Sequence, residues 1–204
     1  MVTVRTAPAR GRPRRAESTD AILDAALAVL AERGYRAMTL DDVAARARAS
    51  KPTMYRRWPT KVAIVAAAIL HGLDRANPLA AHVRPASRDD APAARLLRIV
   101  ENVRSALVST PLGGAIRAVI SEVAHEPILA DALRVVERSR RPILAGAVRA
   151  LQEAGAFDAR RDPDTVVDLL LGAIYFRVLV RQERPGPPFS REVVAVLLGD
   201  AVPR

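Results

Sequence analysis

The stretch from Thr39 to Lys61, TLDDVAARARASKPTMYRRWPTK, limits what this chain can fold into more than any other part of it. It predicts two short helices joined by a tight turn, because Thr39 and Ser50 are good helix caps and each precedes a helix-forming run. Met54 and Trp58 are expected to point inward from the second helix, which also carries Tyr-Arg-Arg. Many proteins bind the major groove of DNA with the second, basic helix of such a pair, so we expect a DNA-binding head here.

Apolar residues at helical spacing predict helices along the rest of the chain, and no useful run alternates as a strand would. The expected fold class is all-α, with an N-terminal three-helix DNA-binding head that contains the helix-turn-helix and a C-terminal helical domain. Gly34 is expected to end the first helix, and Ser190 to cap the last. The helices, about nine in all, are expected near residues 18–33, 39–47, 50–58, 60–73, 89–109, 110–125, 126–154, 162–182 and 190–198.

Three parts follow from these patterns: a flexible basic arm over residues 1–16, a helix-turn-helix DNA-binding domain over 17–61, and a larger helical domain over 62–204. Residues 1–61 hold 13 Lys and Arg against six Asp and Glu, a net charge of +7, out of +10 for the whole chain. This asymmetry favours a polyanion as the partner of the N-terminal part. Charge alone leaves solubilising surface charge as an equal alternative.

Composition and motifs disfavour several classes of function. The chain has no Cys, which excludes disulfides and thiolate chemistry. None of its three His is paired at metal-ligand spacing, and no Ser/His/Asp order or Gly-rich phosphate loop stands out, so we expect no metal, no cofactor and no enzymatic activity. The apolar runs are far shorter than a membrane span, and no apolar segment follows the basic start. We therefore expect a cytoplasmic protein without a membrane partner.

The block AILDAALAVLAERGYRAMTLDDVAARARASKPTMYRRWPTKVAIVAAAI, in the first third of the chain, resembles the TetR family of transcriptional regulators. Arg48 stands where that family commonly has Gly in the turn, and Pro52 where Gly or another small residue is common. The resemblance implies a homodimer that binds a palindromic operator in double-stranded DNA and, as a repressor, leaves it when a small molecule binds. The alternative is a DNA-binding helical protein without an inducer, that is, a constitutive regulator or an architectural protein.

Within that resemblance, the helix from Lys51 to Trp58 enters the major groove, and its first turn faces base edges or phosphates. Tyr55 could donate its hydroxyl to a phosphate or pack on the head, and Thr39 could hold a phosphate as well as cap its helix. For the arm, both an A·T-rich minor groove and a non-specific basic tail remain open. The candidate DNA contacts are Arg12, Arg14, Thr39, Arg46, Arg48, Lys51, Pro52, Thr53, Tyr55, Arg56 and Lys61.

The middle helices are expected to enclose a ligand pocket, and the last two to pair with a second copy of the chain in a four-helix bundle. A mostly aliphatic lining favours a hydrophobic effector. The candidate ligand-binding residues are Val103, Arg104, Leu107, Ile116, Val119, Ile120, Val123, Val136 and Tyr175. The candidate dimer residues are Leu170, Ile174, Val178, Val193, Val196 and Leu197. For both sets the alternative is ordinary packing within one subunit.

Overall fold

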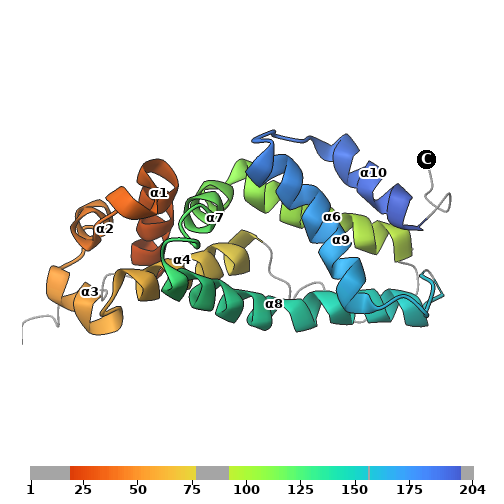
Figure 1. Cartoon of the computed structure of the whole chain (residues 1–204), viewed down its shortest axis with the longest axis horizontal. Helices are drawn as coiled ribbons and strands as arrows, with labels where there is room; N and C mark the ends of the chain where they lie inside the picture. The colour runs from red at the N-terminus through yellow and green to blue at the C-terminus, as the bar shows by residue number, and fades with distance from the viewer. Residues whose placement is uncertain (1–18, 77–91, 156, 199–204) are drawn as a thin grey trace, which may run out of the picture.

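The computed structural model describes residues 19–76, 92–155 and 157–198 and arranges them as a series of packed helices (Figure 1). These residues form nine α-helices and one π-helical turn and contain no strand, which confirms the all-α class. Within the same ranges, no helix is long and apolar enough to cross a membrane. The predicted basic arm, with Arg12 and Arg14, lies outside the described residues.

The head is formed by α1 (Thr19–Ala37), α2 (Leu40–Ala47) and α3 (Lys51–Arg57). Thr39 caps α2 as predicted, because its hydroxyl accepts a hydrogen bond from the Asp42 N–H at 3.1 Å, and Asp42 Oδ2 accepts one from the Thr39 N–H at 3.1 Å. This reciprocal pair satisfies two N–H groups that the start of a helix leaves unpaired. Gly34 breaks the helix where predicted, with non-helical φ 77° and ψ 169°, and beyond this kink a short helical segment completes α1 at Ala37.

The turn between α2 and α3 depends on a strained residue. Arg48 ends α2 in the left-handed conformation, at φ 52° and ψ 38°, where its N–H still reaches the Ala45 carbonyl at 3.3 Å. A residue with a Cβ pays roughly 1 kcal/mol for this conformation, which is why Gly is commoner in such turns. Ser50 begins α3, but its hydroxyl donates to Thr53 Oγ1 at 2.8 Å and does not accept a backbone N–H as a cap would.

The body contains α4 (Lys61–Ala76), α6 (Pro92–Ser109), α7 (Leu112–Ile120), α8 (Pro127–Glu153), α9 (Pro163–Tyr175) with its π-helical continuation (Phe176–Val180), and α10 (Pro187–Leu198). Two boundaries differ from the prediction. The first is α7, which ends at Ile120 and is followed by a turn over 121–125. The second is α10, which begins at Pro187, so that Ser190 lies inside the helix, fully buried, and donates to Glu101 at 2.6 Å instead of capping.

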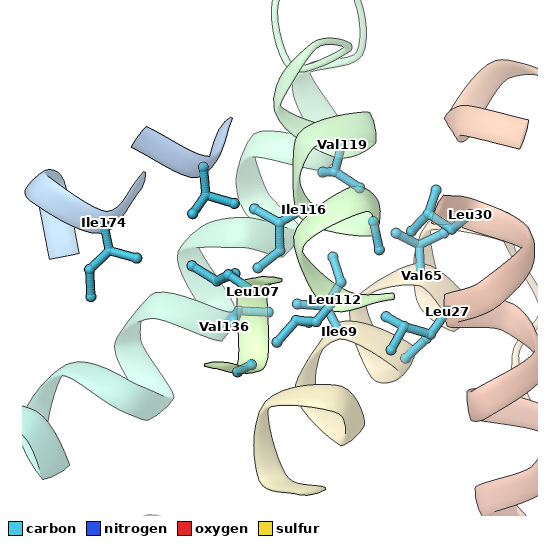
Figure 2. Packing of buried hydrophobic residues seen from close by; sticks show 14 of the residues in the cluster. Leu27, Leu30, Val65, Ile69, Leu107, Leu112, Ile116, Val119, Val136 and Ile174 are labelled. Atoms are coloured by element: carbon cyan, nitrogen blue, oxygen red, sulfur yellow. The ribbon is translucent and has the colours of Figure 1, made fainter. Parts of the chain in front are cut away.

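One hydrophobic core runs from the head into the body. Its centre lies where α1 meets α4 and α7, as Figure 2 shows for Leu27, Leu30, Val65, Ile69, Leu112, Ile116 and Val119. In Figure 1 the head is at one end of the molecule, α8 runs along the body, and α9 and α10 lie toward the other end. The head is therefore joined to the body by packed side chains as well as by the chain itself.

We predict that Gly113→Ala destabilises the fold by more than about 2 kcal/mol. A Cβ at Gly113 would lie 2.0 Å from the Leu107 carbonyl oxygen, which is a backbone atom and cannot rotate away. Gly146 is the matched control, since a Cβ there meets no atom within 4 Å. Gly146→Ala, inside α8, should be neutral or stabilising by up to about 1 kcal/mol. Urea unfolding followed by circular dichroism compares the two, and equal stabilities would contradict the close approach at Gly113.

Candidate DNA-binding surface and ligand cavity

One side of α3 packs on the head and the other is open to solvent. Met54 and Trp58 are buried, as predicted for both. The open side carries four of the eleven candidate DNA contacts, namely Lys51, Pro52, Tyr55 and Arg56, with Thr53 half-buried among them. Tyr55 keeps 48% of its surface exposed, which favours an outward role over packing. Cations and hydroxyl groups are thus gathered on one short helix, as in a helix that reads a DNA groove.

Two of the candidate cations are held in ion pairs within the head. Arg46 Nη1 lies 2.5 Å from Glu32 Oε2, and Lys51 Nζ lies 2.7 Å from Asp41 Oδ2. The hydrogen bond to each carboxylate raises the pKa of its cation. To bind a phosphate, Arg46 would have to leave Glu32 or bind both groups at once, and the same holds for Lys51 and Asp41.

Other candidates differ in how far they are engaged. Arg48 and Arg56 are exposed and form no ion pair with any residue in the described ranges. Thr39 uses its hydroxyl twice within the capping box, since it also donates to Asp42 Oδ2 at 2.7 Å. In this state of the head, the two arginines are therefore more available to DNA than the Thr39 hydroxyl.

Lys61 lies at the joint between head and body. Its Nζ donates to the Arg36 carbonyl at 3.1 Å and sits 4.3 Å from the centroid of the Tyr35 ring, and burial lowers its pKa. Arg36 in turn places Nε 2.6 Å from Oε2 of Glu122, in the turn after α7. This candidate phosphate contact is thus linked to the same corner where α1 meets the segment that follows α7.

A cavity of about 400 Å³ lies in the body between α4, α6, α7, α8 and α9. Five of the predicted ligand-binding residues line it, namely Val103, Ile116, Ile120, Val136 and Tyr175. The other four do not line it. Leu107 and Val119 belong to the packed core, and Val123 lies in the turn because α7 ends early. Arg104 is turned away toward α10, with its guanidinium paired to Glu101 and 2.8 Å from the Pro185 carbonyl oxygen.

The sequence analysis missed the polar side of this cavity, which Glu137, Arg140, Arg141 and Asp168 form. Glu137 and Arg141 are spaced as an i, i+4 ion pair on α8, a signal that was present in the sequence. Asp168 comes from α9 and places Oδ1 2.5 Å from Arg141 Nη2, which no local pattern predicts. Burial, together with the charge of Glu137, raises the pKa of Tyr175 at the same wall.

Comparison with known proteins decides the family. Residues 22–68 match the model of the bacterial regulatory proteins, tetR family, and residues 88–197 match that of the tetracyclin repressor-like C-terminal domain. The chain belongs to the TetR family of transcriptional regulators. It is a helix-turn-helix regulator, and regulators of this family are non-enzymatic DNA-binding proteins.

Relatives agree with this assignment over nearly the whole chain. An uncharacterized HTH-type transcriptional regulator of Mycobacterium tuberculosis is 33% identical over 97% of this chain and 90% of its own length. The DNA-binding transcriptional repressor TetR of Mycobacteroides abscessus is 48% identical over 61 residues, which is 30% of each chain. Among solved structures, the TetR family transcription regulator SCO0332 is 26% identical with a TM-score of 0.68, covering 89% of this chain and 97% of that one.

The TetR-family body exposes a different set of apolar residues from the one predicted for the dimer. Leu170, Ile174, Val178, Val193 and Leu197 are buried within their own subunit, whereas Val196 is 84% exposed. The other large apolar side chains exposed on α9 and its π-helical continuation are Leu169, Phe176 and Val180. The prediction chose the inward face because α9 is apolar on more than one side, as the run Leu169-Leu170-Leu171 illustrates.

The cavity itself can be tested by filling it. Val136 lines the cavity, whereas Val119 is 1% exposed and packed in the core outside it. We predict that Val136→Phe changes stability by less than about 1 kcal/mol, because the ring can enter open space, while Val119→Phe costs roughly 1–3 kcal/mol through overpacking. Thermal unfolding of the two variants beside the parent protein measures this. A Val136→Phe variant as unstable as Val119→Phe would mean that the cavity is closed in solution.

Proposed function

We propose that this TetR-family regulator is a repressor that binds a palindromic operator as a homodimer and leaves it when a small hydrophobic molecule binds in the body. The observation that carries the proposal is the position of the cavity of about 400 Å³. Its wall includes α4 and α7, and both of these helices also pack on α1 of the head. A ligand in the cavity therefore touches the elements that hold the DNA-binding head.

DNA binding is assigned to the open side of α3 and the turn before it. Arg48 and Arg56 supply cations without ion pairs in the described part of the chain, and Tyr55 supplies a hydroxyl. Arginine can read guanine edges with two hydrogen bonds, and a phenol can donate to a phosphate. Two heads held one helical turn apart, about 34 Å, would contact successive major grooves and add their affinities.

Release is assigned to a shift of the head relative to the body. Ile69 and Leu73 of α4 and Ile116 and Ile120 of α7 line the cavity, while neighbouring positions on both helices pack on α1. A ligand that fits better when α4 and α7 are displaced favours a different head spacing. The size of the effect is limited by the difference between the ligand's affinities for the two states.

Dimerisation is assigned to the exposed apolar residues of α9, its π-helical continuation and α10. Leu169, Phe176, Val180 and Val196 are each more than half exposed, and exposed apolar side chains grouped in this way commonly mark an interface. A two-fold axis through this face pairs the same residues on both subunits. This face includes no residue of the head, so the heads remain free to bind DNA.

The alternative, a DNA-binding protein without an inducer, would have a packed body. A volume of about 400 Å³ is within the usual range of small-molecule sites, and its lining is mostly aliphatic with a few polar groups. An empty apolar space of that size costs stability, so it favours a ligand-binding role. We therefore place ligand release ahead of the constitutive alternative.

For DNA binding, we predict that Tyr55→Phe weakens binding to DNA from around the protein's own gene by about tenfold, because one phosphate hydrogen bond per subunit is lost. The slope of affinity against salt should stay unchanged, since no cation is removed. Arg56→Gln should instead lower that slope by about 0.9 per subunit. Fluorescence anisotropy across salt concentrations measures both quantities.

Arg138→Gln is the control for this experiment, since it removes the same charge from an exposed position on α8 and should change neither affinity nor slope. An equal loss of affinity for every DNA sequence after Tyr55→Phe would argue against sequence-specific binding through α3. Unchanged affinity for all of them would remove Tyr55 from the DNA-binding surface.

For assembly, we predict that Phe176→Glu weakens the dimer by roughly 100-fold or more, because two carboxylates would be buried in a two-fold apolar interface. Ile128→Glu is the matched control, because Ile128 is also about half exposed, at 53%, but lies at the start of α8. Light scattering coupled to size-exclusion chromatography gives the mass of each variant. A dimeric Phe176→Glu protein would place the interface elsewhere.

A further inference from the structure

The charged residues at the ligand cavity are unevenly exposed. Arg140 and Arg141 have side chains only 12% and 30% exposed. The carboxylates around them are far more open, with Asp168 at 64% and Glu137 at 49%. Both of these carboxylates line the cavity, so the groups available to an incoming ligand are mainly acidic.

Both guanidinium groups are already paired with carboxylates of the protein. Arg141 donates to Glu137, to Asp168 at 2.5 Å and to Asp164 at 3.3 Å, and these bonds occupy each of its three nitrogens. Arg140 is held by Asp74 at 2.7 Å on α4. The carboxylates, in contrast, each keep lone pairs that can accept further hydrogen bonds.

The charge balance of this cluster is negative. Among the described residues, the two arginines are paired with four carboxylates, from α4 (Asp74), α8 (Glu137) and α9 (Asp164 and Asp168). A ligand anion would have to compete with these carboxylates for the two guanidinium groups. A ligand cation would add a third positive charge to a cluster of two arginines and four carboxylates, and would so reduce its net negative charge.

We propose that the effector is a hydrophobic amine, with an aliphatic or aromatic body in the apolar part of the cavity and a positively charged nitrogen at Glu137 and Asp168. This inference rests on the proposed ligand-binding function and names the chemical class of the ligand. Tyr175 lies on the same wall, and an aromatic ring attracts a cation as well. The apolar part of the ligand would pack against the aliphatic side of the cavity, which is lined by Ile69, Leu73, Ile116, Leu133 and Leu171.

The test compares three probes with the same hydrocarbon chain: decylammonium, decanoate and decanol, each below its micelle concentration. Isothermal titration calorimetry on the full chain at low salt is expected to give decylammonium about tenfold higher affinity than decanoate. Raising the salt concentration should weaken decylammonium binding but not decanol binding, because only the first involves charge. The net charge of +10 on the whole protein works against the expected order, so non-specific attraction cannot produce it.

Asp168→Asn should lower the affinity for decylammonium by about fivefold while leaving decanol unchanged, and unchanged decanol binding also shows that the cavity is intact. Asp158→Asn is the control, because Asp158 loses the same charge but lies beyond α8, where it pairs with Arg160. Decanoate binding as tightly as decylammonium, or no decylammonium binding, would overturn the proposal.

Anisotropy with operator DNA separates this inference from the proposed function. Release of DNA by decanoate, without decylammonium binding, would keep ligand release and overturn the amine. Decylammonium binding that leaves DNA affinity unchanged would support the amine class and contradict ligand release.

Discussion

The contact of α1 with α4 and α7 is the packing on which the rest of the molecule depends. Leu27 and Leu30 of α1 and Leu112 of α7 belong to one continuous core, so the head has no separate interior of its own. Close-packed interiors resist small displacements and switch between arrangements instead of deforming smoothly. The position of α3 is therefore fixed by residues that lie some distance from any DNA contact, and a change at the cavity wall has a mechanical route to the head.

Both functional regions are built from charges that the chain first satisfies internally. Lys51 and Arg46 have carboxylate partners in the head, and Arg141 has three in the body. The consequence differs between the two regions. In the head, the pairs reduce the number of cations offered to DNA, whereas in the body they tie the guanidinium groups to carboxylates that are themselves more exposed.

Local interactions were predictable from the sequence, and interactions across the fold were not. The Thr39 capping box was anticipated because both partners lie within one turn of helix. Arg48 was singled out by the family resemblance, which places Gly in this turn, and its backbone is left-handed. The pairing of Asp168 with Arg141 and the inward face of α9 depend on which helices come together, and helical periodicity shows that a stripe is apolar without showing what covers it. Ser190 illustrates the limit, because a residue with the chemistry of a cap is buried inside a helix, bound to Glu101.

The internal ion pairs of the head also bear on how such a protein finds its site among other DNA. If Lys51 exchanged Asp41 for a phosphate, Asp41 would lose its partner and attract a cation from solution, which would partly offset the counterions released from DNA. This would weaken non-specific binding most, because binding to an arbitrary DNA sequence depends almost entirely on counterion release. The time spent on wrong sequences would then be short, although residues 1–61 carry a net charge of +7.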